Sequence, residues 1–102
     1  MANPEITKYS KEITSLCLAH NVKTLFVFGS VLTPQFNSES DIDLIVDIES
    51  EDPFDYTDNY FDLKFKLQDL FQRSIDLLEQ KAVKNPYLMQ EINNTKVLVY
   101  GK

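Results

Sequence analysis

The fold is decided by residues 25–46, LFVFGSVLTPQFNSESDIDLIV, in which an apolar run ends at Gly29-Ser30 and a second run opens with Asp41-Ile42-Asp43. A Gly-Ser turn after a strand exposes backbone N–H groups and a hydroxyl, and these attract phosphate oxygens. If the second run is a strand, Asp41 and Asp43 share one face, with Cα atoms roughly 6–7 Å apart. Two carboxylates at that spacing suit a hard divalent cation. The stretch therefore predicts a site for a metal-bound phosphate.

The composition predicts one domain over residues 1–102. A chain of 102 residues, 43% of them hydrophobic, is long enough for one small core and short for two. The formal net charge of −6 and the pI near 4.6 argue against a broad grip on a polynucleotide, which needs clustered Lys and Arg. A single nucleotide carried on a metal is compatible with this charge.

The single Cys17 excludes an intramolecular disulfide, and its place on an apolar helical stripe predicts core packing. The chain opens without a signal peptide pattern, and it has no apolar run of transmembrane length. We therefore expect a reduced, cytoplasmic protein that does not bind a membrane.

Apolar spacing and turn residues predict an alternating α/β chain with no internal repeat. Asn-Pro pairs mark two helix starts, because proline is favoured in the first helical turn. Helices are expected over 4–20, 54–72 and 86–92, with a short helical turn after Ser30. Strands are expected over 25–28, 41–46, 73–78 and 95–100.

Three other features have plain structural interpretations. His20-Asn21 is expected to end the first helix, with His20 as a cap or surface residue. The acidic segment 47–55 reads as a solvated loop. The aromatic residues of the long helix are expected mainly to pack in the core, with one of them open to a partner or a base. They are Tyr56, Tyr60, Phe61 and Phe65.

Common motifs do not explain the opening stretch. The residues after Asp41 are apolar where a calcium loop needs polar ligands and a glycine, and neither a P-loop nor a Gly-x-Gly-x-x-Gly pattern occurs. The chain has no Cys/His cluster for zinc, and Ser30 has no convincing histidine partner for triad chemistry. Asp76 stands out on the third predicted strand, although a lone aspartate on a strand is usually an edge or turn residue.

Gly29-Ser30, ten intervening residues, Asp41-Ile42-Asp43-Leu44 and a later Asp76 together resemble the minimal nucleotidyltransferases of the polymerase-beta superfamily. The resemblance covers nearly the whole chain and includes the IDLL of the third strand, the NPYL helix start and the closing VLVYG. It implies a small α/β fold with a mixed central sheet of about four strands and helices packed against it.

The resemblance also implies a site and a reaction. Gly29 and Ser30 would bind the β- and γ-phosphates, Asp41 and Asp43 would hold two Mg²⁺ ions, and Asp76 would complete the metal site and help deprotonate the attacking hydroxyl. An acceptor hydroxyl would attack the α-phosphate of a nucleoside triphosphate, with ATP as the default donor, and release pyrophosphate. Clustered carboxylates that fix cations suit this chemistry, because positioning and cations stabilise its transition state.

One departure from the family pattern concerns charge. Many relatives carry Arg-Gly shortly after the Gly-Ser, where this chain has Thr33-Pro34. The substitution removes a bidentate phosphate contact and bears on nucleotide affinity and rate. Four other cations are candidates to supply the charge: Lys23, Arg73, Lys96 and Lys102.

Family members of this size act beside HEPN-type proteins in toxin–antitoxin pairs, which implies an antitoxin here. The leading expectation is AMP transfer to a tyrosine of a HEPN toxin. One alternative is a weak or inactive relative that neutralises the HEPN protein by binding alone, and another is a subunit that modifies a small molecule such as an antibiotic. The acceptor, the donor base and a homo-oligomeric state are left open.

Overall fold

The computed structural model describes residues 4–29 and 41–101. Its helices are α1 (Pro4–Lys8), α2 (Ser10–Ala19), α3 (Pro53–Phe71), the 3-10 turn η2 (Gln80–Ala82) and α4 (Pro86–Thr95). Its strands are β1 (Val22–Phe28), β2 (Ile42–Ile48), β3 (Ile75–Glu79) and β4 (Val97–Tyr100). No helix within these residues is long and apolar enough to cross a membrane.

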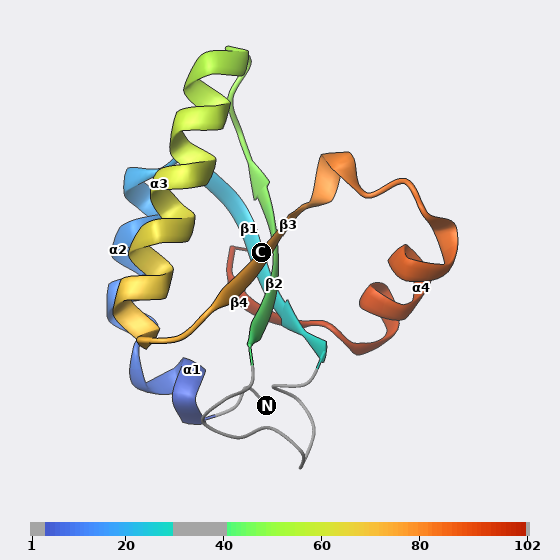
Figure 1. Cartoon of the computed structure of the whole chain (residues 1–102), viewed down its shortest axis with the longest axis horizontal. Coiled ribbons are helices and arrows are strands. Elements are labelled where there is room, and N and C mark those ends of the chain that lie inside the picture. The colour runs from blue at the N-terminus through green and yellow to red at the C-terminus, as the bar shows by residue number, and fades with distance from the viewer. Residues whose placement is uncertain (1–3, 30–40, 102) are drawn as a thin grey trace.

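The four strands form one mixed sheet in the order β3-β2-β1-β4 (Figure 1). β1 is antiparallel to both β2 and β4, whereas β2 and β3 run parallel. The parallel pair needs a long crossover, which α3 provides between the two strands. The predicted α/β fold with a mixed four-stranded sheet and packed helices is confirmed.

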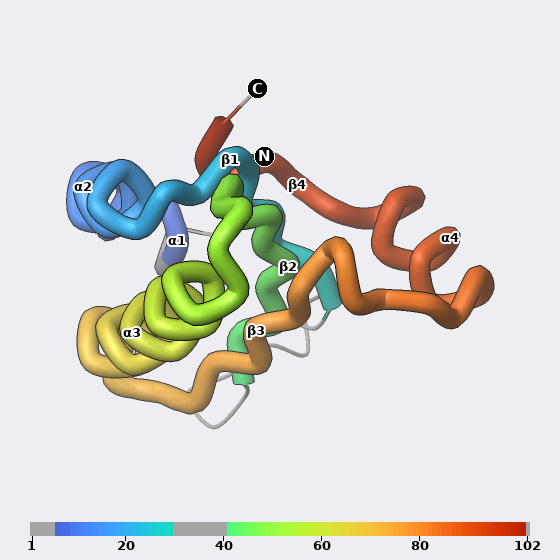
Figure 2. The backbone as a smooth tube through the Cα atoms, turned by 90° about the horizontal axis from the view of Figure 1, so that it is seen from above, coloured from blue at the N-terminus to red at the C-terminus, as the bar shows by residue number. Residues whose placement is uncertain are grey.

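Helices α2 and α3 cover one face of this sheet, and α4 lies on the other side (Figure 2). On the helix-covered face, Leu25 of β1 and Leu44 of β2 are at most 1% exposed. They belong to one apolar cluster with residues of both helices, including Cys17 of α2 and Leu67 of α3. Burial raises the pKa of the Cys17 thiol to about 12, in agreement with the core position expected for it.

The N-terminal segment forms two helices instead of the single predicted one. The chain leaves helical geometry at Tyr9, with φ −106° and ψ 19°, and the Tyr9 ring packs edge-on against Phe71 at 5.2 Å between centroids. Asn21 takes the left-handed conformation expected of the residue after the helix, with φ 57°. His20 was expected to be a cap or a surface residue, and the cap alternative is confirmed; the side chain is buried, at 4% exposure.

Helix α3 begins earlier than predicted, because the Asp52 side chain caps it by accepting a hydrogen bond from the Phe54 N–H at 2.9 Å. Pro53 occupies its first turn, where a missing N–H costs nothing. The predicted loop over 47–55 is correspondingly too long, since Asp47 still lies in β2.

The aromatic residues of α3 divide between two environments. Tyr56 and Tyr60 pack against the core, whereas Phe61 and Phe65 are 51% and 65% exposed. Core packing is therefore confirmed for two of the four rings, and two rings are exposed where one was expected. Apolar spacing alone did not separate the two groups, because aromatic residues occur on both sides of this helix.

Candidate functional site

The site is assembled by strand register at one end of the sheet. Phe28 pairs with Asp43 across β1 and β2, and Asp43 pairs with Asp76 across β2 and β3. Gly29 follows Phe28 directly and ends β1. Because paired residues of neighbouring strands point to the same face, Asp43 and Asp76 lie side by side, opposite the helix-covered core.

Gly29 lies against the Asp43 carboxylate. Its φ of 76° is unfavourable for any residue with a side chain. A Cβ built there would overlap Asp43 Oδ2 and would lie 3.2 Å from Asp43 Cγ. The structure therefore places this predicted site residue beside the predicted carboxylate, and only glycine fits the position. Ser30, its predicted partner in phosphate binding, lies outside the described residues.

Asp41 precedes β2 and is exposed. Alternation puts it on the same face as Asp43, and a hydrogen bond from the Ile42 N–H to the Ser74 carbonyl, at 3.1 Å, holds this end of β2 against the start of β3. The backbone thus gathers Asp41, Asp43 and Asp76 at one end of one face.

The carboxylates of the three aspartates do not converge on a common metal position in this structure. Across residues 4–29 and 41–101, no three His, Cys, Asp or Glu side chains converge closely enough to hold a metal ion. Neighbouring strands are about 4.8 Å apart, so side-chain rotation of Asp43 and Asp76 is enough to bring their oxygens together. Mg²⁺ takes oxygen ligands, commonly one or two carboxylates together with substrate phosphates and waters, and the three aspartates offer only oxygen donors. The metal-binding role of the three residues remains a prediction.

The carboxylate-bearing face also carries a cation that the sequence named only as one of four. The Lys96 Nζ lies 4.1 Å from the centre of the Phe26 ring. Phe26 pairs with Ile45, two residues along β2 from Asp43, which places it roughly 7 Å along the strand from the carboxylate row. Lys96 therefore stands on the same face as the predicted phosphate site.

The other candidate cations lie elsewhere. Arg73 follows the end of α3 and adjoins Ser74, at the start of β3 near Asp41. Lys23 lines a shallow hollow with Glu49. Lys102 is outside the part of the chain that the structure describes. Position alone favours Lys96 and Arg73 over Lys23.

Tyr60 is a positioning residue that sequence reasoning assigned only to packing. Its hydroxyl donates a hydrogen bond to the Leu77 carbonyl at 2.5 Å, which ties α3 to the strand that carries Asp76. Burial, followed by the negative charges of Glu79 and Asp76, raises the pKa of Tyr60. The phenol therefore stays protonated and remains a donor. No local motif signals this contact, because it joins residues 17 positions apart.

Comparison with known proteins identifies the family. Residues 11–102 match the family described as Polymerase beta, Nucleotidyltransferase. The chain belongs to the polymerase-beta nucleotidyltransferase family. This nucleotidyltransferase is 35% identical to protein adenylyltransferase MJ0128 of Methanocaldococcus jannaschii, as that relative is named, over 78% of this chain and 79% of the relative. A second relative from the same organism, MJ1379, carries the same name and is 29% identical over the same shares.

Solved structures agree with the fold of the nucleotidyltransferase. A protein described as a minimal nucleotidyltransferase superposes with a TM-score of 0.76 at 24% identity, over 95% of each chain. A toxin–antitoxin structure with AMP-PNP gives 0.70 at 20% identity, over 91% of this chain and 73% of the other. A complex of tri-AMPylated Shewanella oneidensis HEPN toxin with MNT antitoxin gives 0.66 at 18% identity, over 95% and 73%.

Proposed function

We propose that this nucleotidyltransferase is a cytoplasmic antitoxin that transfers AMP from ATP to a tyrosine of a HEPN-family partner in a Mg²⁺-dependent reaction. The observation that carries the proposal is the register row in which Gly29, Asp43 and Asp76 meet at one end of the sheet. The backbone at Gly29 lies against the Asp43 carboxylate, and the family motif places its phosphates at this turn.

Asp41, Asp43 and Asp76 are the residues that would hold Mg²⁺. When bound, the metal would supply positive charge against the phosphate oxygens. Gly29 leaves the Asp43 carboxylate uncovered, and its neighbour Ser30 is proposed to contact the β- and γ-phosphates. Lys96 would add the cation that Thr33-Pro34 does not provide, because its ammonium group lies on the same face of the sheet.

In the proposed reaction the acceptor oxygen forms a bond to the α-phosphorus of ATP, and the bond from that phosphorus to the pyrophosphate oxygen breaks. Asp76 would accept the hydroxyl proton at a carboxylate oxygen, since it is exposed at the edge of the sheet where an acceptor can approach. Pyrophosphate leaves, and AMP remains esterified to the acceptor.

Three observations support a protein as the acceptor. Two relatives are named as protein adenylyltransferases, and two of the similar structures are described as toxin–antitoxin structures. A net charge of −6 disfavours a polynucleotide acceptor. We also propose that residues 1–102 form one domain and that a partner protein presents the acceptor.

A binding-only antitoxin is the second candidate, and the exposed Phe61 and Phe65 favour it. Large apolar side chains on the surface support association whether or not catalysis follows. The two functions differ in one measurable respect, which is the covalent transfer of AMP.

The test uses a purified HEPN-family protein as the candidate partner, with α-labelled ATP and Mg²⁺. Wild type is compared with Asp41→Asn/Asp43→Asn, and with Glu51→Gln as a control that removes an exposed carboxylate away from the site. We expect label on the partner with wild type and with Glu51→Gln, and none with the double variant. Inhibition of the partner without label in all three proteins would establish binding alone.

A further inference from the structure

The outer surface of α3 carries an aligned row of aromatic side chains. Phe54, Phe61 and Phe65 are 82%, 51% and 65% exposed. Their spacing of seven and then four residues places them on one side of a helix, opposite the buried Leu63 and Leu67. The row is roughly 17 Å long at 1.5 Å per residue. We call these three residues the aromatic face of α3.

Acidic side chains border the aromatic face on the side toward α2. Asp58, Asp62 and Asp69 are all exposed on α3. Asp62 marks the direction, because it contacts His20 of α2, with Nε2 and Oδ2 2.5 Å apart. Lys66 offsets part of this charge through an ion pair with Asp62 at 2.9 Å. The border nevertheless remains net negative, as is the whole chain.

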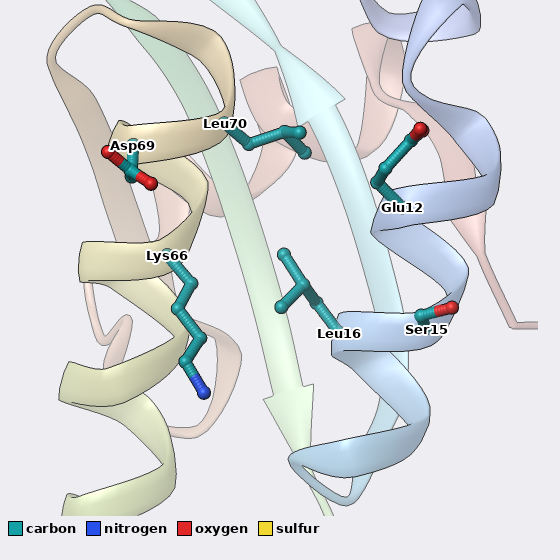
Figure 3. Close-up of a pocket in the computed structure, with 6 residues that line it drawn as sticks. All are labelled: Glu12, Ser15, Leu16, Lys66, Asp69 and Leu70. Carbon is teal, nitrogen blue, oxygen red and sulfur yellow. The ribbon is translucent and has the colours of Figure 1, made fainter.

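The apolar surface continues into a groove between α2 and α3. Leu16 and Leu70 point toward each other across it, and Figure 3 shows them between the two helices. The groove has a volume of about 380 Å³, and its rim is formed by Glu12, Ser15, Lys66 and Asp69. Asp69 also lines a hollow beside Phe65, so the groove and the aromatic face adjoin.

We propose that the aromatic face of α3 and the adjoining groove dock an amphipathic helix of a basic partner protein. The inference rests on the proposed function, because it assigns a docking surface to the same protein partner. Scattered exposed apolar residues are ordinary, but three phenyl rings in line with an acidic border match the apolar anchors and flanking Lys or Arg of such a helix. Charge complementarity selects a basic partner and disfavours a second copy of this acidic chain.

This position has a consequence for catalysis. Helix α3 covers one face of the sheet, whereas Asp43 and Asp76 lie on the other face. The docking helix therefore cannot itself present the acceptor hydroxyl. β3 is an edge strand, so a second segment of the partner can pass it to reach Asp76. Docking and AMP transfer are then separable by substitution.

The first experiment measures the affinity of the purified HEPN-family partner for Phe61→Ser/Phe65→Ser by calorimetry. Two lost aromatic anchors should weaken binding at least about 30-fold. The control is Tyr87→Ser, which removes an 82% exposed ring from α4 and should change affinity less than about twofold. Thermal unfolding of each variant verifies its fold. Equal affinity of the double Phe variant and wild type would overturn the proposal.

The second experiment tests the acidic border with Asp58→Asn/Asp69→Asn. The association rate should fall several-fold at low salt, and the difference should vanish near 0.5 M salt, where charges are screened within a few ångströms. An association rate equal to that of wild type at low salt would contradict a basic partner.

Two outcomes separate this proposal from the proposed function. If the double Phe variant binds the partner with unchanged affinity and still transfers AMP, the docking proposal is wrong and the proposed function stands. If binding is tight and depends on Phe61 and Phe65 but no AMP is transferred, the docking proposal stands and the proposed AMP transfer is wrong. Sedimentation tests a second copy as the occupant. If wild type dimerises, the double Phe variant is monomeric and both bind the partner equally, the aromatic face binds a second copy and the docking proposal is overturned.

Discussion

The two faces of the sheet are built from alternate residues of the same strands and have opposite characters. In β2, Leu44 and Val46 are buried beneath α2 and α3. On the opposite face, Asp43 and Asp47 are only partly covered and flank Ile45, which is buried. The first face is wholly apolar along this strand, whereas the second combines a buried isoleucine with carboxylates. On the second face, the Lys81 Nζ lies 3.5 Å from Asp47 Oδ1 and the Lys96 Nζ lies over Phe26.

The residues that stabilise the fold and the residues proposed for catalysis lie on different faces of the sheet. Burial of aliphatic side chains on the helix-covered face supplies the free energy that holds the strands in register. That register then brings the Asp43 and Asp76 positions side by side on the other face. Substitutions on the first face should lower stability, and substitutions on the second should alter activity with little loss of fold.

The largest expected effect is that of Asp41→Asn/Asp43→Asn on AMP transfer. Loss of several kcal/mol of cation-mediated stabilisation should lower the rate by about 10³-fold or more. Thermal stability should change little, because neither side chain belongs to the buried apolar core. Transfer of labelled AMP measures the rate, and calorimetric unfolding measures the stability. A large drop in the melting temperature would contradict the view that this face contributes little to stability.

Leu67→Ala tests the helix-covered face, since Leu67 is fully buried. Loss of its side chain should lower the free energy of unfolding by about 2–5 kcal/mol. Urea unfolding gives this value, and AMP transfer per folded molecule should stay within about twofold of wild type. Destabilisation below about 1 kcal/mol would mean that this face does not control the fold.

Gly29→Ala should lower both the stability of the protein and its rate of AMP transfer. The left-handed backbone should cost about 1–2 kcal/mol of stability, and the new Cβ should displace the Asp43 carboxylate. Gly101→Ala is the matched control, because Gly101 also has a positive φ, 105°, and a Cβ there would lie 2.5 Å from the Lys23 carbonyl oxygen. Both variants should unfold more easily, but only Gly29→Ala should lose AMP transfer per folded molecule. Equal activity in the two variants would remove Gly29 from the site.

Lys96→Gln should raise the KM for ATP a few-fold, because one cation near phosphate contributes on the order of 1 kcal/mol. Its effect on stability should be at most about 0.5–1 kcal/mol, from the lost contact with Phe26. Lys84→Gln is the control, since Lys84 is exposed before α4. A KM for ATP unchanged by Lys96→Gln would leave the departure at Thr33-Pro34 uncompensated by this residue.

The smallest expected effect concerns pH. His20 Nδ1 lies 2.6 Å from the Leu16 carbonyl and Nε2 lies 2.5 Å from Asp62, so both ring nitrogens face an oxygen. The hydrogen bond from His20, followed by that from Lys66, lowers the pKa of Asp62. A lowered folded-state pKa gives stability that is present above the ordinary carboxyl value of about 3.9 and is lost as pH falls through the folded value.

As the pH falls from about 5 to about 2, the range in which an ordinary carboxyl group titrates, Asp62→Asn should therefore lose less unfolding free energy than wild type. The change should be small, because the Asp62 side chain is 52% exposed and solvent screens its charge. Urea unfolding across this range measures it. An unchanged pH profile would show that the contact with His20 does not couple to folding.

The sequence predicted the alternating order of elements and most of the strands, because apolar runs and Asn-Pro caps are local signals. It did not predict the break at Tyr9, the burial of His20 or the exposure of Phe61 and Phe65. These depend on which side of each helix meets the sheet. Tyr9 contacts Phe71 and His20 contacts Asp62, and both partners lie far away in the chain.

By itself, the sequence determined the chemistry available to the protein: the Gly-Ser turn, the Asp-x-Asp pair, the later Asp76 and an acidic balance that disfavours polynucleotides. Only the tertiary structure decided which of these groups meet. Register across three strands places Asp76 beside Asp43 and Gly29 against the same carboxylate, and the fold places Lys96 on their face. The physical reason is that spacing along a chain sets which face of its own strand a residue occupies, whereas hydrogen-bonded register and core packing set its neighbours.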